Sequence, residues 1–245
     1  MRISFYKSSM PNICQTDETI AVLKANPKTH CGPTAAANAL ISLARNFQML
    51  IEPIGRHDIT SAINRLIEQL SGCMKTGSID AKEKGTNAIN LAEGTKKYVT
   101  DRGYKISRCE WKGWGAGEIY PVCESPSTNW IVENSPGNSN VILHLGWYEL
   151  DPDDFKYYRS SGHYVNIAGF QDEENKLIVH DPSPRSKQKP KHCETIEIER
   201  GLLNNFPKLH DATSYLELNG IDVNRSLGAN VAVIDGAFTF EVSCK

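Results

Sequence analysis

The spacing of the apolar residues changes near Gly103, and this change restricts the folds open to the 245-residue chain more than any other feature. Upstream, apolar side chains recur every three or four positions, as on one face of an amphipathic helix, over about residues 31–47, 59–70 and 87–102. Downstream, the sequence predicts short β segments at 104–111, 141–148, 163–170, 177–181, 195–199, 230–234 and 237–242. Helices followed by antiparallel strands are the order of an α+β domain. We therefore predict an α+β fold in which N-terminal helices pack on an antiparallel β-sheet.

Cys31 stands where a polar loop turns into the first of these helices, in the segment THCGPTAAANAL. Pro33 fits only in the first helical turn, because its missing N–H would have no intrahelical partner there. Cys31 is thus predicted at or just before a helix N-terminus, where the helix dipole and free N–H groups favour a thiolate over a thiol. A thiolate is the nucleophile that acyl transfer needs. The competing interpretation is a buried structural cysteine.

His163 opens a later apolar strand, in SGHYVNIAGF, and Asp181 ends the next one, in LIVHDPSP. The polar loop QDEENK between the two strands predicts a hairpin that returns Asp181 alongside His163. A carboxylate there would hold the imidazole in one tautomer and stabilise its charged form. Asn166 is a rival for this role, but its offset of three positions from His163 places it on the opposite face of the strand.

These three blocks, in this order, resemble the signature blocks of the C39-like, papain-fold cysteine peptidases. The resemblance covers roughly residues 12–185 and implies Cys31 as nucleophile, His163 as general base and acid, and Asp181 as the group that orients it. His163 follows Cys31 by 132 positions (163 − 31), within the range of papain-like peptidases. The family also places a glutamine upstream of the cysteine, where its amide helps to form the oxyanion hole. Gln15, 16 positions before Cys31, is the candidate, with the Cys31 backbone N–H as second donor.

The domain organisation follows from the extent of this resemblance. We predict a papain-like, C39-like peptidase domain over residues 1–185 and a β-rich extension over residues 186–245, packed on the same domain. A chain of this length suffices for one large domain or for a small domain with an appendage.

The predicted function is that of a cysteine peptidase or amidase, which cleaves a peptide or amide bond of a peptide or protein substrate through an acyl-enzyme on Cys31. Two alternatives use the same residues. A Cys-His-Asp acyltransferase of the transglutaminase-like kind would pass the acyl group to an amine, and a papain-fold binding protein would not cleave at all. The sequence does not distinguish water from an amine as acceptor.

Composition and patterning argue against several other classes of protein. A net charge of −2 without blocks of like charge does not suit a nucleic-acid partner. No run approaches the ~18 apolar residues of a membrane helix. The seven cysteines contain no CxxC pair, and the grouping of His180, His192 and Cys193 repeats no ligand spacing, so we expect neither a metal nor another cofactor.

The remaining expectations concern location and the substrate groove. The first residues contain no apolar h-region, so we expect a cytoplasmic protein, or a secreted or periplasmic one if a signal precedes this sequence. The oligomeric state stays open. Trp111, Trp114, Trp147 and Tyr148 are candidates to line a groove, although aromatic residues more often lie in the core. The acidic segment 151–154 is a candidate to attract basic substrate residues, although a solvated turn is its more common role.

Overall fold

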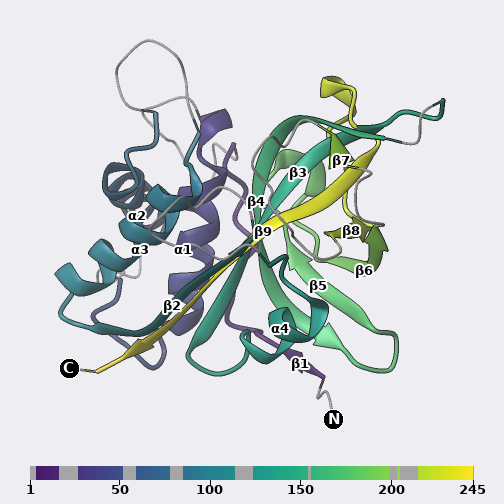
Figure 1. Cartoon of the computed structure of the whole chain (residues 1–245). Coiled ribbons are helices and arrows are strands. Elements are labelled where there is room, and N and C mark those ends of the chain that lie inside the picture. The colour runs from purple at the N-terminus through teal and green to yellow at the C-terminus, as the bar shows by residue number, and fades with distance from the viewer. Residues whose placement is uncertain are drawn as a thin grey trace.

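The computed structural model describes residues 4–16, 27–51, 59–77, 85–113, 124–153, 156–198, 203–204 and 215–244. Three long helices lie together on one side of a large β-sheet (Figure 1). They are α1 (Cys31–Leu43), α2 (Ile59–Cys73) and α3 (Ala88–Asp101). A short helix, α4 (Thr128–Glu133), and three single-turn 3-10 helices, Pro27–Thr29, Pro184–Ser186 and Arg225–Leu227, complete the helical elements of the described residues.

The sheet contains nine strands within the part of the chain that the structure describes. They are β1 (Phe5–Tyr6), β2 (Lys105–Gly113), β3 (Ser139–Leu150), β4 (Tyr157–Gln171), β5 (Lys176–His180), β6 (Lys191–Ile198), β7 (Leu203–Asn204), β8 (Tyr215–Asn219) and β9 (Val231–Ser243). Seven of them follow the order β1-β4-β3-β9-β8-β6-β5, and β4 also pairs with β5. Of the other two, β2 pairs with β9 and β7 pairs with β4. Strands β4, β3, β9, β8, β6 and β5 therefore close into an antiparallel barrel, which leaves no open edge among these six. The predicted mixture of helices and antiparallel sheet is confirmed.

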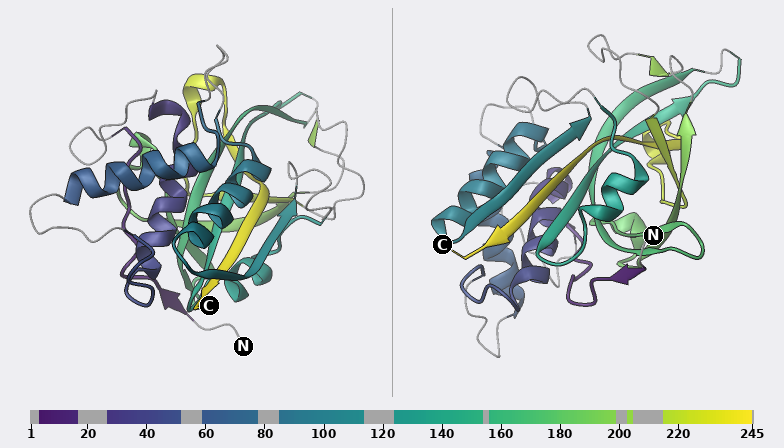
Figure 2. Two further views of the ribbon diagram at one scale, coloured as in Figure 1. Left: turned by 90° about the vertical axis from the view of Figure 1, so that its left-hand side faces the viewer. Right: turned by 60° about the horizontal axis from the view of Figure 1, so that its bottom comes forward.

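The long central strands are covered on both faces, which explains why ten consecutive residues of β3 are buried. Successive side chains of a strand point to opposite faces. Ile142 accordingly packs with the helices, whereas Leu143 packs in the barrel interior. In the right-hand view of Figure 2, the helices lie on one side of β2 and β9 and the barrel on the other. The boundary between these two apolar cores is where side chains from a helix and from the barrel can meet.

Helix α1 is the most deeply buried helix and packs directly on β4. Its alanines at 35, 36, 37 and 39 are fully buried, and such small side chains allow the helix backbone to approach the strand closely. Asn166 of β4 donates a hydrogen bond from Nδ2 to the Ala35 carbonyl, at 2.8 Å. The prediction that this helix reaches residue 47 is wrong: it ends at Leu43, and turns then bring Phe47 back onto the core.

The C-terminal strand β9 lies inside the sheet, between β3 and β8, and it also pairs with β2. The prediction of two separate strands at 230–234 and 237–242 is wrong, because one strand runs through both. The register opposite β3 skips Asp235, which forms a β-bulge between the partners of His144 and Leu145. Strands on both sides of residue 185 thus belong to one sheet, and a domain boundary at that residue stays a prediction. No helix of the described residues is long and apolar enough to cross a membrane.

Candidate active site

Cys31 is the first residue of α1, so its thiol lies at the positive end of the helix dipole. The preceding His30 occupies the N-cap position, and its side chain makes no capping hydrogen bond. Burial by itself would raise the pKa of the Cys31 thiol. A hydrogen bond to His163, the charge of that imidazole and backbone hydrogen bonds from Tyr164 and Gly32 outweigh burial and lower this pKa below its ordinary value. The geometry therefore favours the thiolate form of Cys31.

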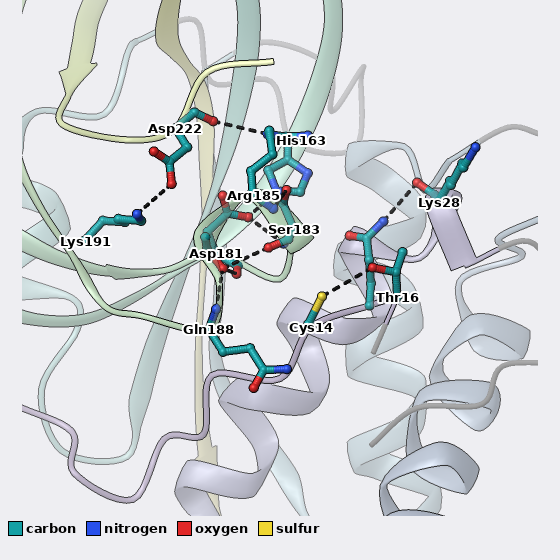
Figure 3. A network of polar contacts seen from close by, with 12 residues as sticks. Cys14, Thr16, Lys28, His163, Asp181, Ser183, Arg185, Gln188, Lys191 and Asp222 are labelled. Carbon is teal, nitrogen blue, oxygen red and sulfur yellow. Dashed lines mark hydrogen bonds and ion pairs between the residues drawn. The ribbon is translucent and has the colours of Figure 1, made fainter. Parts of the chain in front are cut away.

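His163 lies on β4 and is held from its far side by Asp181, which directly follows β5. Its Nε2 lies 2.6 Å from Asp181 Oδ1, and the two side chains are 7% and 0% exposed. Burial alone would lower the pKa of His163, but the charge and hydrogen bond of Asp181, together with Cys31, raise it to about 9. Asp181 Oδ1 also accepts a hydrogen bond from the Ser183 backbone N–H at 2.7 Å (Figure 3). Since Asp181 occupies Nε2, Nδ1 is the ring nitrogen left to face the thiol.

The hairpin between β4 and β5 explains how Asp181 reaches His163. The two strands pair antiparallel with Asn166 opposite His180, so the residue after His180 returns toward the start of β4. Asn166, the rival orienting group, instead donates to α1 and fixes the helix that carries Cys31. The structure thus brings Cys31, His163 and Asp181 together and leaves Asn166 in a supporting position.

Gln15 is buried close to the segments that contain Asp181 and Cys31. Its backbone N–H donates to the Pro182 carbonyl at 2.8 Å, and its side-chain Nε2 donates to the Lys28 carbonyl at 3.0 Å. These two contacts fix Gln15 to the segment that follows Asp181 and to the turn that precedes Cys31. Figure 3 shows Lys28 on the helical side of this region and Asp181 on the barrel side. A primary amide carries two N–H donors, one of which Lys28 positions.

Trp147 of β3 shields the imidazole from water. Its ring stacks on His163 with centroids 5.6 Å apart and an angle of 23° between the planes, and the Arg185 guanidinium lies 5.1 Å from the indole centroid. Trp147 is buried, as are Trp111 and Tyr148, so these three lie in the core and do not form an exposed groove wall. The fourth candidate aromatic, Trp114, lies outside the described residues.

Cys31 lines a cleft of about 380 Å³. Its other lining residues come from the start of α3 and from the facing strands: Gly85, Thr86, Asn87, Ala88, His144, Arg159, Gly162 and Tyr164. His144 stacks on Tyr164 with centroids 4.8 Å apart. Burial, followed by the charges of Arg159 and His163, lowers the pKa of His144 to about 3, so this imidazole is neutral near pH 7.

Neither His144 nor Arg159 lies in a sequence block that resembles the peptidase family. Simple alternation along β4 would place Arg159 on the face opposite Gly162 and Tyr164. The register against β3 skips Ser160, and this bulge lets Arg159 line the same cleft as those two residues. A bulge depends on the partner strand, so no local sequence pattern could have identified Arg159.

The residues considered for a metal site are dispersed. His180 Nδ1 lies 3.1 Å from the Pro11 carbonyl, His192 Nδ1 lies 2.6 Å from Gln171 Oε1, and Cys193 is buried in the barrel core. Within the described ranges, no group of three or more His, Cys, Asp and Glu side chains is placed to hold a metal ion.

Comparison with known proteins gives a family match that covers most of the chain. The Peptidase_C39 like family matches residues 7–200, a range that contains Gln15, Cys31, His163 and Asp181. No curated protein matches the sequence significantly. Among solved structures, the crystal structure of the Pseudomonas avirulence protein AvrPphB is similar with a TM-score of 0.35 and 11% identity, over 94% of this chain and 99% of that chain.

Proposed function

The chain belongs to the Peptidase_C39 like family, and on that premise we propose that it is a papain-like cysteine peptidase that uses Cys31 as its nucleophile. One observation carries the proposal. The thiol at the start of α1 is hydrogen-bonded to His163, whose Nε2 is held 2.6 Å from a buried aspartate. This arrangement provides a nucleophile, a base that activates it and a group that orients the base.

In the acylation step, the Cys31 sulfur attacks the carbonyl carbon of the substrate amide, and a C–S bond forms. The lowered pKa of Cys31 and the raised pKa of His163, about 9, both favour transfer of the thiol proton to the imidazole before the attack. His163 then donates this proton to the amide nitrogen as the C–N bond breaks and the amine leaves. A thioester remains on Cys31.

The oxyanion that forms during this attack needs hydrogen-bond donors close to the sulfur. We assign this role to the Cys31 backbone N–H and to the Gln15 amide. The contacts of Gln15 with Pro182 and Lys28 support the assignment, since they anchor the residue between the two segments that carry Asp181 and Cys31.

In deacylation, His163 takes a proton from water, the water oxygen bonds to the thioester carbon, and the C–S bond breaks to regenerate the thiolate. An amine in place of water would give acyl transfer through the same residues. Added amines separate the two outcomes: a peptidase releases the free acid as its main product, and a transferase releases the amide.

The direct test is the rate at which iodoacetamide alkylates Cys31 between pH 4 and 9, located by peptide mass spectrometry. We expect fast labelling well below the ordinary thiol pKa of about 8.5. In His163→Ala, labelling should rise only near that value. The exposed His192 provides the matched control, since His192→Ala should leave the profile unchanged.

If the alkylation rate of Cys31 in the unmodified protein rises only near the ordinary thiol pKa, the proposal is overturned. That result would favour a protein that binds without cleaving. Cleavage of a peptide pool by the wild type, lost in Cys31→Ala, would complete the case. Cleavage that persists in Cys31→Ala would also contradict it.

A further inference from the structure

The cleft beside Cys31 has an unusual charge distribution. Among the described residues that line it, Arg159 is the one with a permanent charge, because His144 is neutral near pH 7 and Cys31 is paired with His163. The side chain of Arg159 is 19% exposed. A ligand that enters the cleft therefore meets a cation close to the nucleophile.

Asp235, an anionic partner of Arg159, does not line the cleft. Arg159 Nε lies 2.8 Å from Asp235 Oδ2, and Asp235 is fully buried. The Tyr148 hydroxyl donates to the other carboxylate oxygen at 2.8 Å. Asp235 thus holds the arginine from behind through Nε. A guanidinium has five donors in a fixed planar fork, which matches the geometry of a carboxylate.

Two glycines make room for this pair. A side chain at position 146 would bring its Cβ within 2.5 Å of Asp235 Oδ2, and one at position 162 would lie 2.6 Å from Arg159 Nη2. The bulge at Asp235 on β9 and the bulge at Ser160 on β4 place the two partners at the same point of the barrel. The two glycines and the two bulges, which lie on β3, β4 and β9, together place the Arg159 guanidinium at the wall of the cleft.

A purely structural ion pair is a poor explanation for this arrangement. A buried ion pair contributes little net stability, since the cost of removing two charges from water offsets their attraction. A structural pair also has no need to expose its cation next to a nucleophile. Bulges occur preferentially beside active sites, where they re-aim a side chain. The start of α3, which also lines the cleft, adds positive potential of the same sign.

We propose that Arg159 determines the specificity of the cleft by binding a carboxylate of the substrate close to the scissile bond. The carboxylate belongs either to an Asp or Glu side chain or to the C-terminus of a peptide. This inference rests on the proposed peptidase function and adds the substrate class. It also opposes the expectation that the acidic segment 151–154 selects basic substrates: its described residues, 151–153, do not line the cleft, and residue 154 lies outside the described residues.

The test compares internally quenched peptides that differ at single positions by Glu, Gln or Lys, each made with a free and with an amidated C-terminus. We expect kcat/KM to favour Glu over Gln by at least about tenfold at one position, or the free C-terminus over the amide by a similar factor, because hydrogen bonds between charged partners are the strong ones. The first result identifies a side-chain carboxylate and the second a terminal one.

The informative variant replaces both partners, Arg159→Met with Asp235→Asn, so that no buried charge is left unpaired. The preference should disappear in this variant. Alkylation of Cys31 and a thermal melt show whether the site is still folded, and Arg159→Lys, which keeps the charge, provides a second readout. The matched control is Arg108→Met with Glu110→Gln, a pair 3.9 Å apart on β2 that does not line the cleft.

Equal cleavage of the Glu, Gln, free and amidated peptides by the wild type would overturn the inference and leave the peptidase proposal intact. Retention of the preference in the folded double variant would also overturn it. If the wild type cleaves none of the peptides, the peptidase proposal fails. Fluorescence-polarisation binding of the same peptides to Cys31→Ala then decides the inference by itself, since Glu or the free C-terminus must still bind more tightly.

Discussion

At the scale of single residues, one proton links Cys31 and His163, and its position sets the pH range of the chemistry. The pKa of Cys31 is lowered and the pKa of His163 is raised to about 9. In the proposed mechanism, the pair of thiolate and imidazolium is the reactive form. The two pKa values shift in opposite directions, and both shifts favour the charged forms, because each group stabilises the charged form of the other.

We therefore predict a bell-shaped dependence of kcat/KM on pH. As the pH falls, protonation of the Cys31 thiolate should reduce the rate. As the pH rises through about 9, loss of the His163 proton should reduce it again, because the leaving amine then has no acid. Asp181→Ala should move the alkaline limb to lower pH, since the carboxylate raises the pKa of His163. A profile with the same alkaline limb in that variant would contradict the assignment.

Gln15 provides a second prediction at this scale. If its amide stabilises the oxyanion, Gln15→Ala should lower kcat by about 10²–10³-fold with little change in KM, because the oxyanion exists only in the transition state. Steady-state kinetics on a cleaved peptide measures both constants. Gln171→Ala, at the end of β4, is the matched control. A rise in KM with an unchanged kcat would assign Gln15 to substrate binding instead.

At the scale of elements, the site depends on how α1 is seated on the barrel. The helix carries Cys31, the proposed nucleophile, and β4 carries His163, its proposed base, so any movement between these two elements separates sulfur from imidazole. Asn166 joins them through its hydrogen bond to the Ala35 carbonyl, and both residues are fully buried. The fully buried alanines of α1 keep the helix backbone close to the strand.

Asn166→Ala should therefore reduce stability by about 1–3 kcal/mol, since the buried Ala35 carbonyl loses its partner. Urea denaturation measures this change. Alkylation of Cys31 should slow as well, because the helix is less firmly held next to His163. An unaltered denaturation midpoint would show that this hydrogen bond does not hold the two elements together. Asn46→Ala, which removes an exposed side-chain hydrogen bond to Asn138, is the control.

At the scale of the whole molecule, the C-terminal segment is part of the framework of the site. Strand β9 pairs with β2, β3 and β8, and Asp235 on β9 holds Arg159 at the cleft. Strands β6 and β8 link β9 to β5, the strand that precedes Asp181. The sequence blocks that contain Cys31, His163 and Asp181 all lie before residue 185, but the barrel that positions them is completed after it.

A chain truncated after residue 185 should consequently fail to fold. The truncation removes three of the six strands of the barrel and leaves the edge of β3 that pairs with β9 without a partner strand. Circular dichroism and a thermal melt of the 1–185 fragment test this expectation. A cooperative transition in the fragment would instead support an independent domain that ends at residue 185.

The sequence by itself determined the parts of the site that neighbouring residues specify. Pro33 marks the first turn of α1 and thereby places Cys31 at its start, and the QDEENK loop marks the hairpin that returns Asp181 to His163. It also indicated the helical first half and the stranded second half. Each of these features depends on interactions within a few residues, such as turn geometry, the first helical turn and the alternation of apolar side chains.

Only the tertiary structure decided how these parts meet. It seats α1 on β4, stacks Trp147 on His163, closes the barrel with β9 and pairs Arg159 with Asp235 across 76 positions of the chain. Such contacts depend on strand register, and a single bulge, as at Ser160 or Asp235, switches the face on which a side chain lies. Register is fixed by pairing between distant segments and by core packing, so it cannot be read from any one segment alone.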